Sequence, residues 1–166
     1  MGSTKIYRIN KMLENALNIG NRKFPKGIDD TENMTVQFTW YKKGGYSLTH
    51  LHPDCEAVYF IGFGEGLEEA SARIILGWPL STGEDVVVNG PTIVEIPTGC
   101  AHTIANVGDR DMYLLRIYTP KTRVSVDLMT GQTFSKSADY AKYANEIYAQ
   151  CPTFDSFLSF ADLHKD

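Results

Sequence analysis

The chain has 166 residues and a formal net charge of −4, with 43% hydrophobic and 22% charged residues. This length suits one domain whose core is large enough to fold without disulfides, and the composition is ordinary for a globular protein. The acidic balance gives no support for nucleic-acid binding, which usually needs a basic face. No apolar run approaches the roughly 18 residues of a membrane span, so we expect no membrane association.

The N-terminus lacks the basic start and the apolar stretch of a secretory signal. The three cysteines, Cys55, Cys100 and Cys151, are odd in number and show no CxxC spacing. A disulfide framework is therefore not expected, and the reducing cytoplasm is the predicted location.

Residues 1–33 mix apolar and polar side chains without strong periodicity, and we expect them to form an extension that packs on the main domain. Within this extension, "NRKFPKGIDDTEN" (21–33) is predicted to be a loop. The reason is that Pro, Gly, Asp and Asn all interrupt regular structure.

From residue 34 to about residue 120 the chain consists of short runs rich in Val, Ile, Tyr, Phe and Thr, separated by turn signals such as "STGED". The runs are "MTVQFTWYK", "EAVYFIGF", "SARIILG", "DVVVN", "TIVEIP", "HTIANV" and "MYLLRIY". Many short strands at this spacing predict an all-β sandwich or barrel over residues 34–120. No helical segments alternate with the strands, which disfavours a parallel α/β sheet.

Residues 121–166 form a predicted C-terminal extension. In "SADYAKYANEIYAQ", the residues Tyr140, Tyr143, Ile147 and Tyr148 fall on one helical face. We therefore predict a helix over about 137–150 that packs its aromatic stripe on the outside of the β domain.

The stretch "HLHPDCE" (50–56) holds two of the four histidines in the chain. Successive side chains alternate between the faces of a strand, so His50 and His52 point to the same side. If the chain turns at "PDC" and returns as a strand, the carboxylate of Glu56 comes back towards the same interior. Two imidazoles and one carboxylate suit iron, manganese, nickel or zinc and leave other coordination positions open.

A fourth candidate ligand is His102, which stands at the start of another predicted strand. Pro97 and Gly99 provide a sharp turn just before it. The remaining histidine, His164, lies near the C-terminus and is expected to be solvated.

These two segments resemble the two motifs of the cupin superfamily. The residues of the first motif are Gly44, His50, His52, Glu56 and Gly62. The residues of the second motif are Gly90, Pro97, Gly99, His102 and Asn106. Two spacings depart from the motifs by one residue: five residues instead of six precede Gly62, and six instead of five precede Pro97.

The resemblance covers about residues 34–120 and implies a cupin-type double-stranded β-helix, a jelly-roll barrel, with a C-terminal helix. It implies that His50, His52, Glu56 and His102 bind one divalent transition metal ion, either Fe or Zn, Ni or Mn. Because members of the superfamily commonly pair through their β sheets, it also implies a homodimer.

Strand alternation predicts that Val58 and Phe60 face the interior with Glu56, and that Tyr59 faces outward. Val58 and Phe60 would then form an apolar wall of a substrate pocket, a role that overlaps with ordinary core packing.

Tyr46 lies on the predicted face of His50 and His52, where its phenol could act as an acid; core packing is the alternative. Cys55 and Cys100 flank the predicted ligands, but we expect both to be structural.

Arginine within an apolar strand is unusual, because burying an unpaired charge is costly. If Arg116 in "LLRIY" faces the interior, it would bind a carboxylate or phosphate of the substrate. The alternative is a solvated sheet face or an ion pair in a dimer, and for Arg73 we favour the outward orientation. Asn106 is expected to fix a strand end.

The resemblance favours a metal-dependent enzyme that acts on a small organic molecule. The habits of the superfamily favour a non-heme iron dioxygenase, with a metal-dependent isomerase or lyase as the alternative. Glu56 could leave the metal and act as a base. A non-catalytic module that binds a small ligand is the other alternative, and the lack of a basic DNA-binding segment disfavours it.

Overall fold

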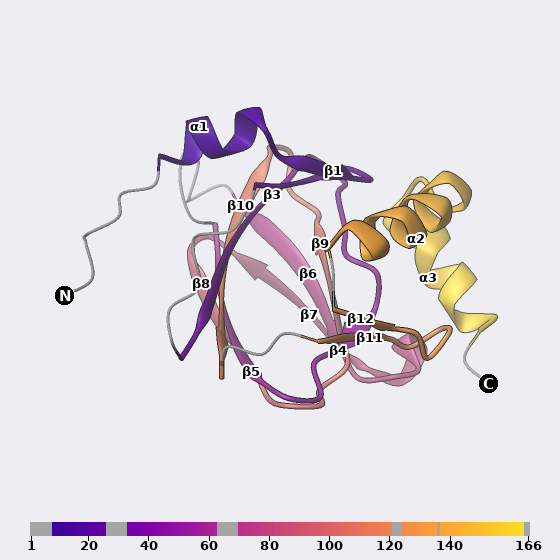
Figure 1. Ribbon diagram of the computed structural model, residues 1–166. Helices are drawn as coiled ribbons and strands as arrows, with labels where there is room; N and C mark the ends of the chain where they lie inside the picture. The colour runs from indigo at the N-terminus through magenta and orange to yellow at the C-terminus, as the bar shows by residue number, and fades with distance from the viewer. Residues whose placement is uncertain (1–7, 26–32, 63–69, 121–123, 136, 165–166) are drawn as a thin grey trace.

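The computed structural model describes residues 8–25, 33–62, 70–120, 124–135 and 137–164 (Figure 1). In these ranges the chain forms two antiparallel sheets of six strands each. The first sheet has the order β1 (Leu17–Ile19), β2 (Arg22–Phe24), β3 (Thr35–Tyr41), β10 (Met112–Thr119), β5 (Glu56–Ile61) and β8 (Thr92–Ile96). The second has the order β12 (Thr133–Phe134), β11 (Ser125–Asp127), β4 (His50–Leu51), β9 (His102–Asn106), β6 (Ser71–Leu76) and β7 (Glu84–Asn89).

The predicted all-β architecture is confirmed. Each of the seven predicted runs forms a strand. In most of them, though not in the exposed β7, apolar side chains pack into the space between the sheets. The buried residues of this core come from both sheets and include Tyr41, Tyr59, Ile74, Ile104 and Leu114.

The N-terminal extension adds two strands to the first sheet. The loop predicted from residue 21 is wrong for Arg22–Phe24, which form β2 between β1 and β3. Pairing with the edge of β3 outweighs the local turn signals here, because it buries the Arg22 and Phe24 side chains. Residues 26–32 of that predicted loop lie outside the described residues.

Within the described residues, four helical segments accompany the sheets: α1 (Ile9–Glu14), the short 3₁₀ helix η2 (Leu80–Thr82), α2 (Ser137–Gln150) and α3 (Phe154–Asp162). The predicted helix over 137–150 is therefore confirmed at both ends, whereas α3 was not predicted. Thr153 begins α3 with a reciprocal capping box to Ser156. Among the described residues, no helix is long and apolar enough to cross a membrane.

The helices α2 and α3 lie together on one side of the barrel (Figure 1). A second hydrophobic cluster joins them to the sheets through Ile19, Leu48, Ala105 and Phe157. The aromatic stripe of α2 packs against this cluster, as predicted.

The segment before β4 contains one more residue than the strand it faces. Tyr46 pairs with Ala105 and His50 pairs with His102, so four steps along one chain oppose three along the other. Such an extra residue is a β-bulge, and it moves the following side chains to the other face of the sheet. His50 therefore faces the barrel interior, whereas Tyr46 joins the helix-side cluster.

The expected placement of Tyr46 beside the histidines is corrected by this bulge. Its ring packs against Tyr148 and Phe157, and its hydroxyl donates a hydrogen bond to the carbonyl oxygen of Cys151. Tyr46 thus holds the end of α2 to the sheet, and the proposed acid role has no basis in this geometry.

Replacing Tyr46 with Phe is expected to destabilise the protein without affecting the histidines. The change leaves the buried Cys151 carbonyl without this donor, which should lower the free energy of unfolding by ~1–3 kcal/mol in urea denaturation. Tyr113→Phe is the control, because that ring stacks on Phe38 at 5.4 Å in the first sheet. A Tyr46→Phe variant of unchanged stability but reduced metal affinity would contradict this assignment.

Candidate metal centre

Three histidines converge in the interior of the barrel. His50 in β4 lies directly opposite His102 in β9, and His52 follows two residues after His50. One ligand nitrogen from each ring lies within 4.8 Å of the others. All three side chains are buried, with at most 8% of their surface exposed. The structure therefore brings together the three histidines predicted from the two motifs.

Each of the three imidazoles is oriented by a backbone carbonyl. The Nδ1 atoms of His50, His52 and His102 bond to the carbonyl oxygens of Leu48, Val124 and Cys100 at 2.8, 2.8 and 3.0 Å. A carbonyl oxygen only accepts, so Nδ1 carries the hydrogen and Nε2 presents its lone pair. Metal-binding histidines are commonly held in this way by a hydrogen bond from the other ring nitrogen.

The environment keeps the imidazoles of His50 and His102 neutral. Burial, together with the neighbouring His52 ring and Arg116, lowers the pKa of His102 to about 3. Burial and the other two imidazoles also hold the pKa of His50 well below its usual value. A neutral imidazole is the form that binds metal ions.

Glu56 does not join the histidines, which corrects the predicted fourth ligand. Its side chain is exposed, and β5 instead buries Ala57, Tyr59 and Ile61. Cys55 is 2% exposed and occupies the inward position just before the strand. The turn after His52 therefore shifts the alternation of inward and outward side chains in β5 by one residue from the predicted one.

The same shift corrects the predicted positions of Val58 and Phe60. Both are half-buried on the opposite face of β5 from Tyr59, and neither lines the pocket beside the histidines. The sequence did not define the phase because Val58 and Phe60 are as apolar as Ala57 and Tyr59. Glu56 is the one charged residue of this strand, and its side chain faces solvent.

Tyr59 faces the interior, which corrects its predicted outward orientation. It is 1% exposed, and its hydroxyl lies 2.9 Å from Nε2 of His102 and 3.5 Å from the hydroxyl of Tyr118. Burial raises the pKa of Tyr59 well above its usual value, so the phenol stays protonated. Its hydroxyl donates a hydrogen bond to Nε2 of His102. This hydrogen bond uses the same nitrogen lone pair that a metal ion would use.

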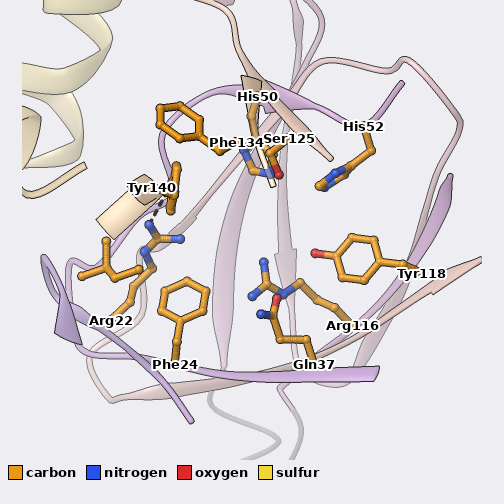
Figure 2. Close-up of a pocket in the computed structure, with 11 residues that line it drawn as sticks. Arg22, Phe24, Gln37, His50, His52, Arg116, Tyr118, Ser125, Phe134 and Tyr140 are labelled. Atoms are coloured by element: carbon orange, nitrogen blue, oxygen red, sulfur yellow. Dashed lines mark hydrogen bonds between the residues drawn. The ribbon is translucent and has the colours of Figure 1, made fainter. Parts of the chain in front are cut away.

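A narrow pocket of about 30 Å³ lies beside His50 and His52 (Figure 2). Its lining residues are Ile19, Arg22, Phe24, Gln37, His50, His52, Arg116, Tyr118, Ser125, Phe134 and Tyr140. Among the described residues, this lining contains two arginines and no Asp or Glu. The pocket is therefore positively charged before any metal ion is considered.

Arg116 faces this interior, which is the orientation that a substrate-binding role requires. It is 5% exposed, donates a hydrogen bond to the hydroxyl of Thr39 and lies over the ring of Phe24. Arg73 faces outward, as favoured, and pairs with Asp85 at 2.7 Å.

Asn106 fixes a strand end, as predicted. Its side-chain amide donates hydrogen bonds to the carbonyl oxygens of Tyr41, Lys42 and Arg110 at 3.3, 3.2 and 2.8 Å. These bonds hold the end of β9 to the turns beside it.

The donor set fits a transition metal ion. Within the described residues, the three histidines are the group of His, Cys, Asp or Glu side chains that could hold such an ion. Neutral imidazole nitrogen suits zinc, copper, iron and nickel, and three protein ligands leave further coordination positions for a substrate. The structure therefore supports the ligands His50, His52 and His102 and removes Glu56.

No protein-family model and no curated protein matches this chain, whereas solved structures do. The oxalate decarboxylase–formate complex from Lactobacillus farciminis matches with a TM-score of 0.60 and 16% identity, over 75% of this chain and 36% of that one. KdgF from Halomonas sp. matches with a TM-score of 0.56 and 11% identity, over 72% and 96%. A protein with a double-stranded β-helix domain from Klebsiella pneumoniae matches with a TM-score of 0.55 and 14% identity, over 74% and 89%.

These similarities define the class of fold. The chain has the double-stranded β-helix of the cupins, as its two motifs implied. Within that fold it carries a buried three-histidine cluster that could hold a metal ion.

Metal binding should depend on the histidines and be independent of Glu56. Glu56→Gln is expected to bind Zn²⁺ with the wild-type affinity and one-to-one stoichiometry in calorimetry of metal-stripped protein. His102→Ala removes a ligand and is expected to weaken binding by about 100-fold or more, since even an outer partner of a ligand is worth ~10–100-fold. A large loss of affinity in Glu56→Gln would contradict the placement of that side chain in solvent.

Acid should destabilise the metal-free protein through its buried histidines. The folded state keeps His102 neutral down to a pKa of about 3, whereas the unfolded chain takes up the proton below about 6.5. Stability is therefore complete above about pH 6.5 and falls towards pH 3, with up to ~1.4 kcal/mol per pH unit from this residue.

The measurement is urea unfolding in the presence of a chelator between pH 7 and pH 4. His102→Gln should show a shallower loss of stability with acid than the wild type, and the exposed control His164→Gln should match the wild type. Equal slopes for all three proteins would contradict the neutral, buried state of His102.

Proposed function

We propose that this chain is a metal-dependent enzyme that acts on a small organic anion. One observation carries the proposal: a buried cluster of three imidazoles lies beside a pocket whose described lining contains buried arginine and no acidic side chain. The ligands are His50, His52 and His102, and Arg116 binds the substrate.

The charge balance of the interior supports an anionic substrate. Burying a cation is costly unless an anion or several hydrogen bonds compensate it. Among the described residues, Arg116 has the neutral Thr39 hydroxyl and the rings of Phe24, Tyr59 and Tyr118 as its partners. Three imidazoles carry no negative charge, so they would leave the charge of a bound divalent ion uncompensated. A carboxylate of the substrate would offset the charge of the ion and that of Arg116.

The residues around the cluster define how the chemistry would be supported. A divalent ion held there would polarise a carbonyl, hydroxyl or carboxylate oxygen of the substrate, and iron would add oxygen chemistry. The guanidinium of Arg116 would orient the anion, and the protonated phenol of Tyr59, beside His102, would donate a hydrogen bond. The rings of Phe24 and Phe134 limit the access of water to the pocket.

Two reaction classes follow from this geometry. A non-heme iron dioxygenase is one, and an isomerase or lyase that uses zinc, nickel or manganese is the other. Because Glu56 is not a ligand, the two-histidine, one-carboxylate set typical of iron oxygenases is not formed, and the ligands no longer favour oxygen chemistry. The structural similarity to an oxalate decarboxylase with bound formate supports a small carboxylate as substrate in either class.

A non-catalytic module that binds a small anion is the second candidate. The hydrogen bond from Tyr59 to His102 favours it, because this bond satisfies the Nε2 atom of His102 without an ion. In that case the arginines and the histidines would bind the anion directly.

The test is metal analysis of protein purified without added metal, repeated on His50→Ala. The expected result is about one transition metal ion per chain in the wild type and in the matched control Glu56→Gln, and none in His50→Ala. Iron would direct the screen to oxygen consumption with small carboxylates, and zinc, nickel or manganese to isomerase and lyase assays. Absence of metal in the wild type, with no uptake on reconstitution, would overturn the enzyme proposal and favour the binding module.

A further inference from the structure

We propose that the pocket has a second anion subsite at Arg22 and that its ligand is a short dicarboxylate. One carboxylate would lie at Arg116 beside the histidines, and the other at Arg22 on the far side of Phe24. This inference rests on the proposed function and deepens it, because it names the class of molecule that the same site binds.

Arg22 is buried without a charged partner. It is 1% exposed, and its guanidinium donates hydrogen bonds to the hydroxyl oxygens of Tyr148 at 2.7 Å and Tyr140 at 3.3 Å. Its Nε atom is buried and has no hydrogen-bond partner. Within the described part of the chain, no carboxylate pairs with it, so its charge is balanced by neutral groups alone.

The two arginines are arranged around one aromatic ring. The guanidinium carbon of Arg22 lies 4.9 Å from the centre of the Phe24 ring, and that of Arg116 lies 5.3 Å from it. Figure 2 shows the two guanidinium groups on either side of Phe24, both directed at the pocket. The Nε atom of Arg116 is also buried without a hydrogen-bond partner.

Two buried like charges need compensation from outside the described protein groups. Each costs desolvation free energy, and their mutual repulsion adds to it. Aromatic faces and hydroxyl groups offset part of this cost, but an anion that forms bidentate bonds to guanidinium offsets more. Retaining both arginines in one pocket is therefore most simply explained by a ligand that carries two negative groups.

The spacing favours a dicarboxylate over a phosphate. A phosphate concentrates its charge on one group, whereas Figure 2 shows these two cations on either side of the Phe24 ring. The pocket is narrow, which favours a short chain between the two carboxylates. Gln37 and Ser125 also line the pocket and offer neutral hydrogen-bonding groups to the remaining oxygens.

The test is calorimetric binding to metal-stripped protein in a chelator at low ionic strength. Malonate and succinate are compared with propionate and butyrate, which have the same chain lengths but one carboxylate. We expect the wild type to bind the better dicarboxylate at least 10-fold more tightly than its matched monocarboxylate. Equal affinity for both members of each pair would overturn the proposal without any variant.

Variants assign the second carboxylate to Arg22. Arg22→Met should abolish the preference for dicarboxylates and leave monocarboxylate affinity within about two-fold, whereas Arg116→Met should weaken both. Arg73→Met is the control, because Arg73 lies outside the pocket and pairs with Asp85. Arg22→Met with the wild-type preference would overturn the subsite.

A thermal readout separates ligand binding from a purely structural role of Arg22. In anion-free buffer, Arg22→Met should melt at the wild-type temperature or above, because it removes a buried charge, and succinate should no longer raise its melting temperature. Should Arg22→Met fail to fold, Arg22→Lys keeps the charge and should retain part of the dicarboxylate preference; loss of fold in both would overturn the proposal in favour of a structural role for Arg22.

The metal-free design keeps the two proposals distinct. A dicarboxylate preference in a protein that takes up no metal would support the subsite and contradict the enzyme. Metal uptake without a preference for dicarboxylates would support the enzyme and contradict the subsite.

Discussion

The antiparallel pairing of β4 with β9 is the constraint on which the site depends. It sets His50 opposite His102, and the bulge before it turns His50 inward while Tyr46 and Leu48 turn towards the helices. Without the extra residue, His50 would share the face of Tyr46 and point into the helix-side core. One inserted residue therefore separates the face that carries the histidine cluster from the face that packs against the helices.

The interior that this pairing creates contains nitrogen and phenol groups, and among the described residues no carboxylate joins the cluster of three histidines. Backbone carbonyls fix the three imidazoles, and the Tyr59 phenol takes the position next to His102 that a carboxylate was expected to fill. A centre of this composition keeps the full charge of a bound ion. It therefore favours an anion as its remaining ligand, in agreement with the arginines in the adjoining pocket.

The two extensions contribute more than coverage of the barrel. Arg22 and Phe24 come from the N-terminal hairpin, and Tyr140 comes from α2, yet all three line the same pocket as the histidines. The segments that resemble the cupin motifs supply the cluster, while segments outside them shape the space beside it. The residues that line this space are therefore ones for which the motifs carry no information.

The sequence by itself determined the strands of residues 35–119, the helix over 137–150 and the three histidine ligands, because alternation and motif spacing are local properties. It could not determine on which face Glu56 or Tyr46 would lie, because apolar residues occupy both faces of β5 and a bulge is invisible in a residue pattern. It also could not show that Arg22 would reach the pocket. Only the tertiary structure decided these points, because strand phase and the meeting of distant segments are set by pairing across the sheets.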